Sequence, residues 1–117
     1  MGLYFLNGGN MKEPLITMVK IYKPLEIGYD WMDYKIHRPE DLTFHHIVEA
    51  RNGGRRVLNN GAILVRKSHE YLNYLDIYYH LVYRDLNYLF KELNSTMLPP
   101  TPDYYEELHH ILRKVKK

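Results

Sequence analysis

The stretch "LTFHHIVEARNGGRRVLNNGAILVRKSHEYLN", residues 42–73, predicts the centre of the fold. Its first part is largely apolar and predicts a strand over 42–50, which carries two adjacent histidines. Glycine and asparagine at both ends of 51–61 predict a loop, and "AILV", residues 62–65, predicts a second short strand. Ser68 suits the N-cap of the helix that follows. The expected order is therefore strand, loop, strand, helix.

The adjacent histidines, His45 and His46, raise a chemical question, because neighbouring residues of a strand point to opposite faces. Chance surface positions, or one hydrogen-bonded core histidine, would explain them without any function. A hairpin with a helix packed across it can also bring this strand close to His69, at the start of the helix. Imidazoles that converge from different elements favour a metal site. The other histidine of the pair would then be free to take a proton.

The segment before this stretch predicts a further strand. Residues 15–23, "LITMVKIYK", contain β-branched residues and alternate roughly between apolar and other positions. Residues 25–43 are polar and aromatic and predict an irregular connection, in which one short helical turn is compatible with the sequence. Together with the central stretch, they favour an α+β fold in a single domain spanning the 117 residues of the chain.

The segment after it predicts helices. Apolar residues recur at helical spacing from His69 to Asn94, either as one long helix or as two helices with a bend near 76–79. Thr101 as N-cap and Pro102 at the first helical position predict a last helix that runs to about residue 114.

The composition excludes several classes of protein. The chain has no cysteine, which removes disulfides, thiolate zinc sites and cysteine nucleophiles. No apolar run reaches the about 20 residues of a membrane span, so no membrane partner is expected. The start of the chain lacks the basic flank of a secretory signal. These features predict a cytoplasmic protein.

Positive charge is concentrated in one region, although the formal net charge is only +2. The chain between Ala50 and His69 contains basic residues and no acid, which favours contact with phosphates. A solvated surface loop would show the same pattern. The basic residues are Arg51, Arg55, Arg56, Arg66 and Lys67.

The chain is also rich in tyrosine, with twelve residues, most of them between Tyr71 and Tyr105. Such a pattern is more typical of a half-buried helix face than of a platform for stacking bases. The tyrosines would be buried within a monomer or against a second copy, so a homodimer through these helices is one expected assembly.

The residues 44–73, "FHHIVEARNGGRRVLNNGAILVRKSHEYLN", resemble the HNH nuclease motif, also called the ββα-metal finger. The family pattern has a histidine pair or acid–histidine pair, a loop with a glycine pair, an asparagine, a short apolar strand, and a histidine or asparagine opening the helix. The corresponding residues here, in matching order and spacing, are His45-His46, Gly53-Gly54, Asn60 and His69.

The resemblance implies a fold and a role for each residue. The finger would cover about 42–80, with an N-terminal strand region before it and a C-terminal helical part over about 81–117. His45 and His69 correspond to metal ligands, and Asn73 stands where many members have a further ligand. His46 corresponds to the general base that deprotonates water, a task that suits a neutral imidazole. Asn60 corresponds to the residue that pins the loop and so orients the base.

The implied reaction is metal-dependent hydrolysis of phosphodiester bonds in DNA, as in nucleases that phages or mobile elements encode. One divalent cation, Mg²⁺ or Mn²⁺, would stabilise charge in the transition state. Many members also bind a structural zinc through two CxxC pairs; this chain has no cysteine, so no structural zinc is expected.

Two alternatives stay open. The finger would serve as the scaffold of a non-catalytic DNA- or protein-binding module, or the three histidines would be structural residues of the core.

Overall fold

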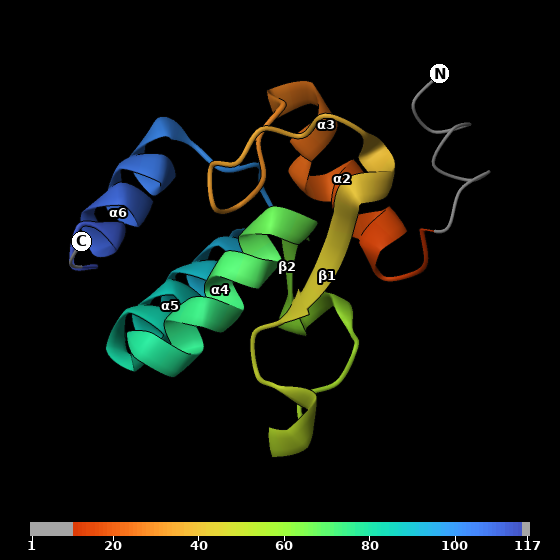
Figure 1. Ribbon diagram of the computed structural model, residues 1–117. Helices are drawn as coiled ribbons and strands as arrows, with labels where there is room; N and C mark the ends of the chain where they lie inside the picture. The colour runs from red at the N-terminus through yellow and green to blue at the C-terminus, as the bar shows by residue number, and fades with distance from the viewer. Residues whose placement is uncertain (1–10, 116–117) are drawn as a thin grey trace.

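In the computed structural model, which describes residues 11–115, five α-helices accompany a two-stranded antiparallel sheet (Figure 1). Helices α2, α4 and α5 contact the strands, and α6 packs on α5. The α+β composition that the sequence predicts is therefore confirmed. Single turns of 3-10 helix occur in the connections. In chain order the main elements are α2 (Leu15–Tyr22), α3 (Pro24–Ile27), β1 (Leu42–His46), β2 (Gly61–Val65), α4 (Arg66–Tyr78), α5 (His80–Thr96) and α6 (Pro102–Leu112).

The two strands pair with Leu42 opposite Val65 and His46 opposite Gly61. The first strand ends four residues earlier than expected. The N–H of Ile47 still bonds the backbone carbonyl of Asn60 at 2.9 Å, but the next N–H, that of Val48, bonds the side-chain oxygen of Asn60 at 2.8 Å, so the pairing of the two backbones stops there. The strand alternation directs Thr43 and His45 toward α4 and α5, and Phe44 toward α2.

The strand expected over 15–23 is wrong, because most of this segment forms α2. Its buried residues, Leu15, Met18, Val19 and Tyr22, recur at helical spacing and make one face of the helix. The apolar residues of this segment fit both the two-residue repeat of a strand and the helical repeat of about 3.6 residues. Packing of the apolar face against β2 selects the helix.

Ser68 is not an N-cap, because α4 already begins at Arg66. The helical run after it divides at Tyr79 into α4 and α5, so of the two alternatives that the sequence left open, the structure selects two helices with a bend. The N-cap expected at Thr101 is confirmed, since its hydroxyl oxygen accepts from the N–H of Tyr104 at 3.3 Å. This last helix ends at Leu112, two residues before the expected end.

The carboxylate of Asp30 joins the irregular connection to the start of α4. Its Oδ1 accepts from the N–H groups of Met32 and Tyr34, each at 2.9 Å. Its Oδ2 accepts from the N–H of Val65 at 2.8 Å and from the hydroxyl of Ser68 at 2.5 Å. Burial raises the pKa of Asp30, and these hydrogen bonds oppose that rise. A negative charge at this end of α4 also suits the helix dipole.

The core lies between the sheet, α2 and α5. Trp31 is fully buried, with its ring 5.0 Å from that of Tyr22 and 6.2 Å from that of Phe90. The hydroxyl of Tyr104 donates to the carbonyl of Trp31 at 2.6 Å and so attaches α6 to this core.

The tyrosines divide between core and surface. Tyr22 and Tyr104 are buried, whereas Tyr74, Tyr78 and Tyr88 are exposed on α4 and α5. The prediction of a half-buried tyrosine face is therefore right for only part of the set. None of the helices within residues 11–115 has the length and apolar character needed to cross a membrane.

We expect Asp30→Ala to lower the free energy of unfolding by at least about 3 kcal/mol, because it leaves three buried donors and one part-buried donor without an acceptor, at roughly 1–3 kcal/mol for each buried donor. Urea denaturation measures this loss. The control is Asp41→Ala, which removes a solvent-accessible ion pair with Arg38 and should cost at most about 1 kcal/mol. Equal losses in the two variants would contradict the central place of Asp30.

Candidate active site

The structure brings His45 and His69 together from different elements. His45 lies on β1 and His69 in the first turns of α4, and their ring centroids are 5.4 Å apart. Metal–nitrogen bonds of about 2.1 Å require two ligating rings to approach within several ångströms, and this separation meets that requirement. The two rings therefore lie close together, as expected from the sequence, while their role as metal ligands stays a prediction.

Hydrogen bonds orient both rings. Nε2 of His45 lies 2.8 Å from Oδ1 of Asn87, on α5. The amide nitrogen of Asn87 donates to the carbonyl of Tyr83 at 3.2 Å, which leaves Oδ1 as the acceptor facing the ring. Nε2 of His45 therefore carries the proton, and its Nδ1 keeps a lone pair.

The tautomer of His69 follows in the same way. The hydroxyl of Thr43 donates to the carbonyl of Leu64 at 2.7 Å, so its oxygen accepts from Nδ1 of His69 at 3.2 Å. Nε2 of His69 is then the nitrogen with a lone pair. A ligating histidine commonly donates its other N–H to a neighbouring oxygen, which is the arrangement of both rings here.

Burial keeps both imidazoles neutral. It lowers the pKa of His45 to about 4, although the hydrogen bond to Asn87 acts in the opposite direction. Burial and the nearby charge of His46 also lower the pKa of His69. A neutral imidazole is the form that binds a metal, so the electrostatics suit this pair for ligation.

His46 lies on the strand beside the pair but has a different environment. It is half-buried and packs edge-on against Phe44, with ring centroids 4.9 Å apart. Within residues 11–115 neither ring nitrogen of His46 forms a hydrogen bond, so one of them is available to accept a proton. Its role as a base stays a prediction.

The side chain of Asn60 braces the loop that follows β1. Its Oδ1 accepts from the N–H of Val48 at 2.8 Å, and its Nδ2 donates to the carbonyls of Val48 and Arg55, each at 3.0 Å. The loop passes so close to itself that a Cβ on Gly54 would lie 1.7 Å from the Val48 oxygen. This bracing fixes the backbone two residues after His46, although a role in orienting that base stays a prediction.

The third expected ligand, Asn73, is exposed on α4, one helical turn after His69. In the described part of the chain no three histidine or acidic side chains gather closely enough to hold a metal. A cation bound at His45 and His69 would therefore complete its coordination with water or with the oxygens of a substrate, as Mg²⁺ and Mn²⁺ readily do.

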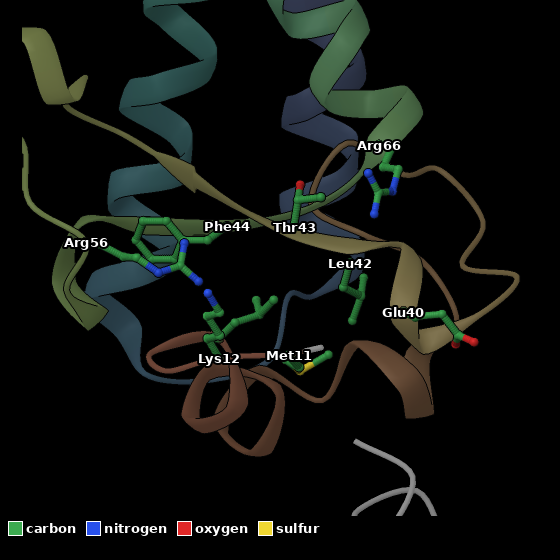
Figure 2. A pocket seen from close by; sticks show the side chains of 9 residues that line it. Met11, Lys12, Glu40, Leu42, Thr43, Phe44, Arg56 and Arg66 are labelled. Carbon is green, nitrogen blue, oxygen red and sulfur yellow. The ribbon is translucent and has the colours of Figure 1, made fainter. Parts of the chain in front are cut away.

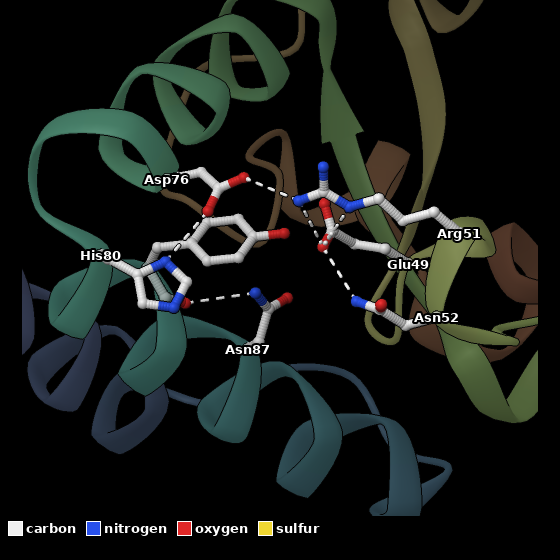
Figure 3. Close-up of polar contacts among 7 residues, drawn as sticks. Glu49, Arg51, Asn52, Asp76, His80 and Asn87 are labelled. Atoms are coloured by element: carbon white, nitrogen blue, oxygen red, sulfur yellow. Dashed lines mark hydrogen bonds and ion pairs between the residues drawn. The ribbon is translucent and has the colours of Figure 1, made fainter.

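The basic residues expected to contact phosphates differ in their surroundings. Arg51 lies 3.1 Å from the carboxylate of Glu49 and 3.9 Å from that of Asp76, which also contacts His80 (Figure 3). These acids offset its charge, so Arg51 suits phosphate contact less than the sequence suggests. Arg55, Arg56, Arg66 and Lys67 are exposed, and no ion pair involves them within residues 11–115.

Sequence reasoning missed Asn87 and Thr43, which orient the two histidines. Thr43 shares a strand face with His45, so the alternation of the strand was a usable signal. Asn87 lies on α5, 42 positions after its partner His45, and no local pattern connects the two.

No family model, curated protein or solved structure matches this chain. The similarity of residues 44–73 to the HNH motif thus rests on the residues themselves, and the roles that it implies stay predictions.

We expect His45 to make folding depend on pH, because the unfolded chain binds its proton more readily than the folded protein does. Stability is full above pH 6.5 and is lost as the pH falls to about 4, by about 3 kcal/mol in total. Urea denaturation in EDTA measures this loss.

The comparison variant is His45→Gln, which should remove most of that pH dependence, while the exposed control His37→Gln should keep it. An unchanged pH dependence in His45→Gln would show that His45 is not the responsible group.

Proposed function

We propose that the protein is a metal-dependent endonuclease that hydrolyses phosphodiester bonds in DNA. The observation that carries the proposal is the approach of His45 and His69, each with one nitrogen held by a hydrogen bond and the other free. Neutral, oriented imidazoles from separate elements are what a metal centre of this type requires. The braced loop at Asn60 and the ββα order of β1, β2 and α4 support the same function.

In this proposal each candidate residue has a separate role. His45 and His69 hold the cation, and Asn73 offers an amide oxygen from the next turn. The cation, when bound, supplies positive charge that stabilises the phosphate in the transition state. His46 accepts the proton of the attacking water, while Asn60 holds the loop beside it.

The DNA would contact the exposed basic residues near the site through its phosphates, which positions the backbone without reading its sequence. Arg55, Arg56, Arg66 and Lys67 are free of acidic partners in the described chain and suit this contact. A homodimer through the exposed tyrosines of α4 and α5 stays a prediction.

We expect the protein to nick or linearise plasmid DNA with Mg²⁺ or Mn²⁺, and His46→Ala to lower the rate by roughly 10²–10⁴-fold, the usual contribution of a general base. Gel analysis of plasmid cleavage measures this rate. The control is His110→Ala, which removes an exposed histidine of α6 and should leave the rate unchanged. Cleavage at the same rate by wild type and His46→Ala would refute the proposal.

A second function, a non-catalytic module that binds DNA or protein, is favoured by one observation: only two of the proposed ligands are histidines and the third is an exposed amide. We expect calorimetry with Mn²⁺ to show binding by the wild type, a loss of at least tenfold in affinity in His69→Ala, and no change in His110→Ala. DNA binding without Mn²⁺ affinity and without cleavage would instead identify the module.

A further inference from the structure

A cavity of about 290 Å³ lies along β1, on the side of the strand toward α2 (Figure 2). Apolar side chains, among them Leu42 and Phe44, form part of its wall. Thr43 also lines it, but the hydroxyl of Thr43 is directed to the opposite face of the strand, where it contacts His69, so β1 separates the cavity from the histidine pair. Its volume is close to the lower end of the range for sites that bind small organic ligands.

Three cations from separate parts of the chain line this cavity: Lys12 before α2, Arg56 in the loop between the strands, and Arg66 at the start of α4. Within residues 11–115 none of them forms an ion pair with an acid. In Figure 2 the charged ends of Lys12 and Arg56 are directed toward each other. Like charges that converge in this way repel unless an anion lies between them.

Arg56 is already held in place for such an anion. Its Nε donates to the carbonyl of Glu13 at 3.3 Å, and its guanidinium lies 4.8 Å from the ring centroid of Phe44. These contacts leave its two terminal nitrogens without a partner among residues 11–115. A fixed guanidinium loses little freedom when it binds, which favours planar oxygen ligands such as phosphate.

The charge of the lining selects among phosphates. Glu40 is the acid of the cavity, so with three cations the lining carries a net charge of +2. A phosphate monoester carries about −1.5 to −2 at pH 7, which balances this charge. A phosphodiester carries a single negative charge and would leave the cavity with an excess of positive charge.

We infer that this cavity binds a phosphate monoester of a nucleotide, with Lys12, Arg56 and Arg66 around the phosphate and the organic group against the apolar wall. The monoester belongs either to a free nucleotide or to the phosphorylated end of a nucleic-acid strand. The inference goes beyond the proposed nuclease, because it assigns a second anion site that does not depend on a cation or on cleavage.

Calorimetry in EDTA tests the inference without any contribution from a metal. We expect a nucleoside 5′-monophosphate to bind at least tenfold more tightly than a dinucleoside monophosphate, whose phosphate is a diester. Inorganic phosphate should compete with the nucleotide. Equal affinity for monoester and diester, or no binding of the monoester, would overturn the inference.

Neighbouring residues supply matched variants. Lys12→Gln and Arg66→Gln each remove one lining cation and should weaken nucleotide binding by about tenfold, the usual effect of a charge-assisted hydrogen bond. Lys67→Gln and Arg55→Gln remove adjacent exposed cations that do not line the cavity, and they should change affinity less than twofold. Equal losses in all four variants would show attraction by diffuse surface charge instead of a site.

Short oligonucleotides distinguish the two sources of the monoester. If the ligand is a strand end, a 5′-phosphorylated oligonucleotide binds more tightly than both its 5′-hydroxyl counterpart and the mononucleotide. If the ligand is a free nucleotide, the mononucleotide binds at least as tightly as the phosphorylated strand. Both results support the site. Equal binding of the two oligonucleotides together with no binding of the mononucleotide would contradict it.

Discussion

The buried carboxylate of Asp30 is the interaction on which the arrangement depends. It accepts four hydrogen bonds, two from its own turn and two from Val65 and Ser68 at the junction of β2 and α4. A buried charge is tolerated only with such complete satisfaction, so this contact holds the junction in one geometry. The start of α4, and with it His69, is thereby placed against β1.

The histidine pair follows from this placement. His69 meets His45 only because α4 starts where it does, and α5 then adds Asn87 behind the strand. Burial keeps the imidazoles uncharged, and the neighbouring oxygens determine which nitrogen holds the proton. The outcome is a pair of closely spaced rings that are neutral near neutral pH, which is the protonation state that the proposed metal site requires.

The basic stretch shows how tertiary contacts change the meaning of a charge. In the sequence its members are equivalent, since each is a cation in a region without acids. In the fold, Arg51 meets the carboxylates of Glu49, two residues before it, and of Asp76 on α4, whereas Arg56 and Arg66 line a cavity with Lys12. The same residue type is neutralised at one position and available to an anion at another, so net charge alone is a poor guide to binding.

The sequence by itself determined the elements whose signals are local. The order of the two strands around their loop and the Thr101 cap follow from turn residues and capping signals, whereas the candidate set of His45, His46, Asn60 and His69 comes from the resemblance to the HNH motif. Only the tertiary structure decided that residues 15–22 are helical, that the hydroxyl of Ser68 donates to the carboxylate of Asp30, and that Asn87 orients His45. A short apolar pattern such as that of residues 15–22 is compatible with both a strand and a helix, and tertiary packing decides between them. Hydrogen-bond partners that are distant in the chain leave no local sequence pattern, so only the folded structure shows them.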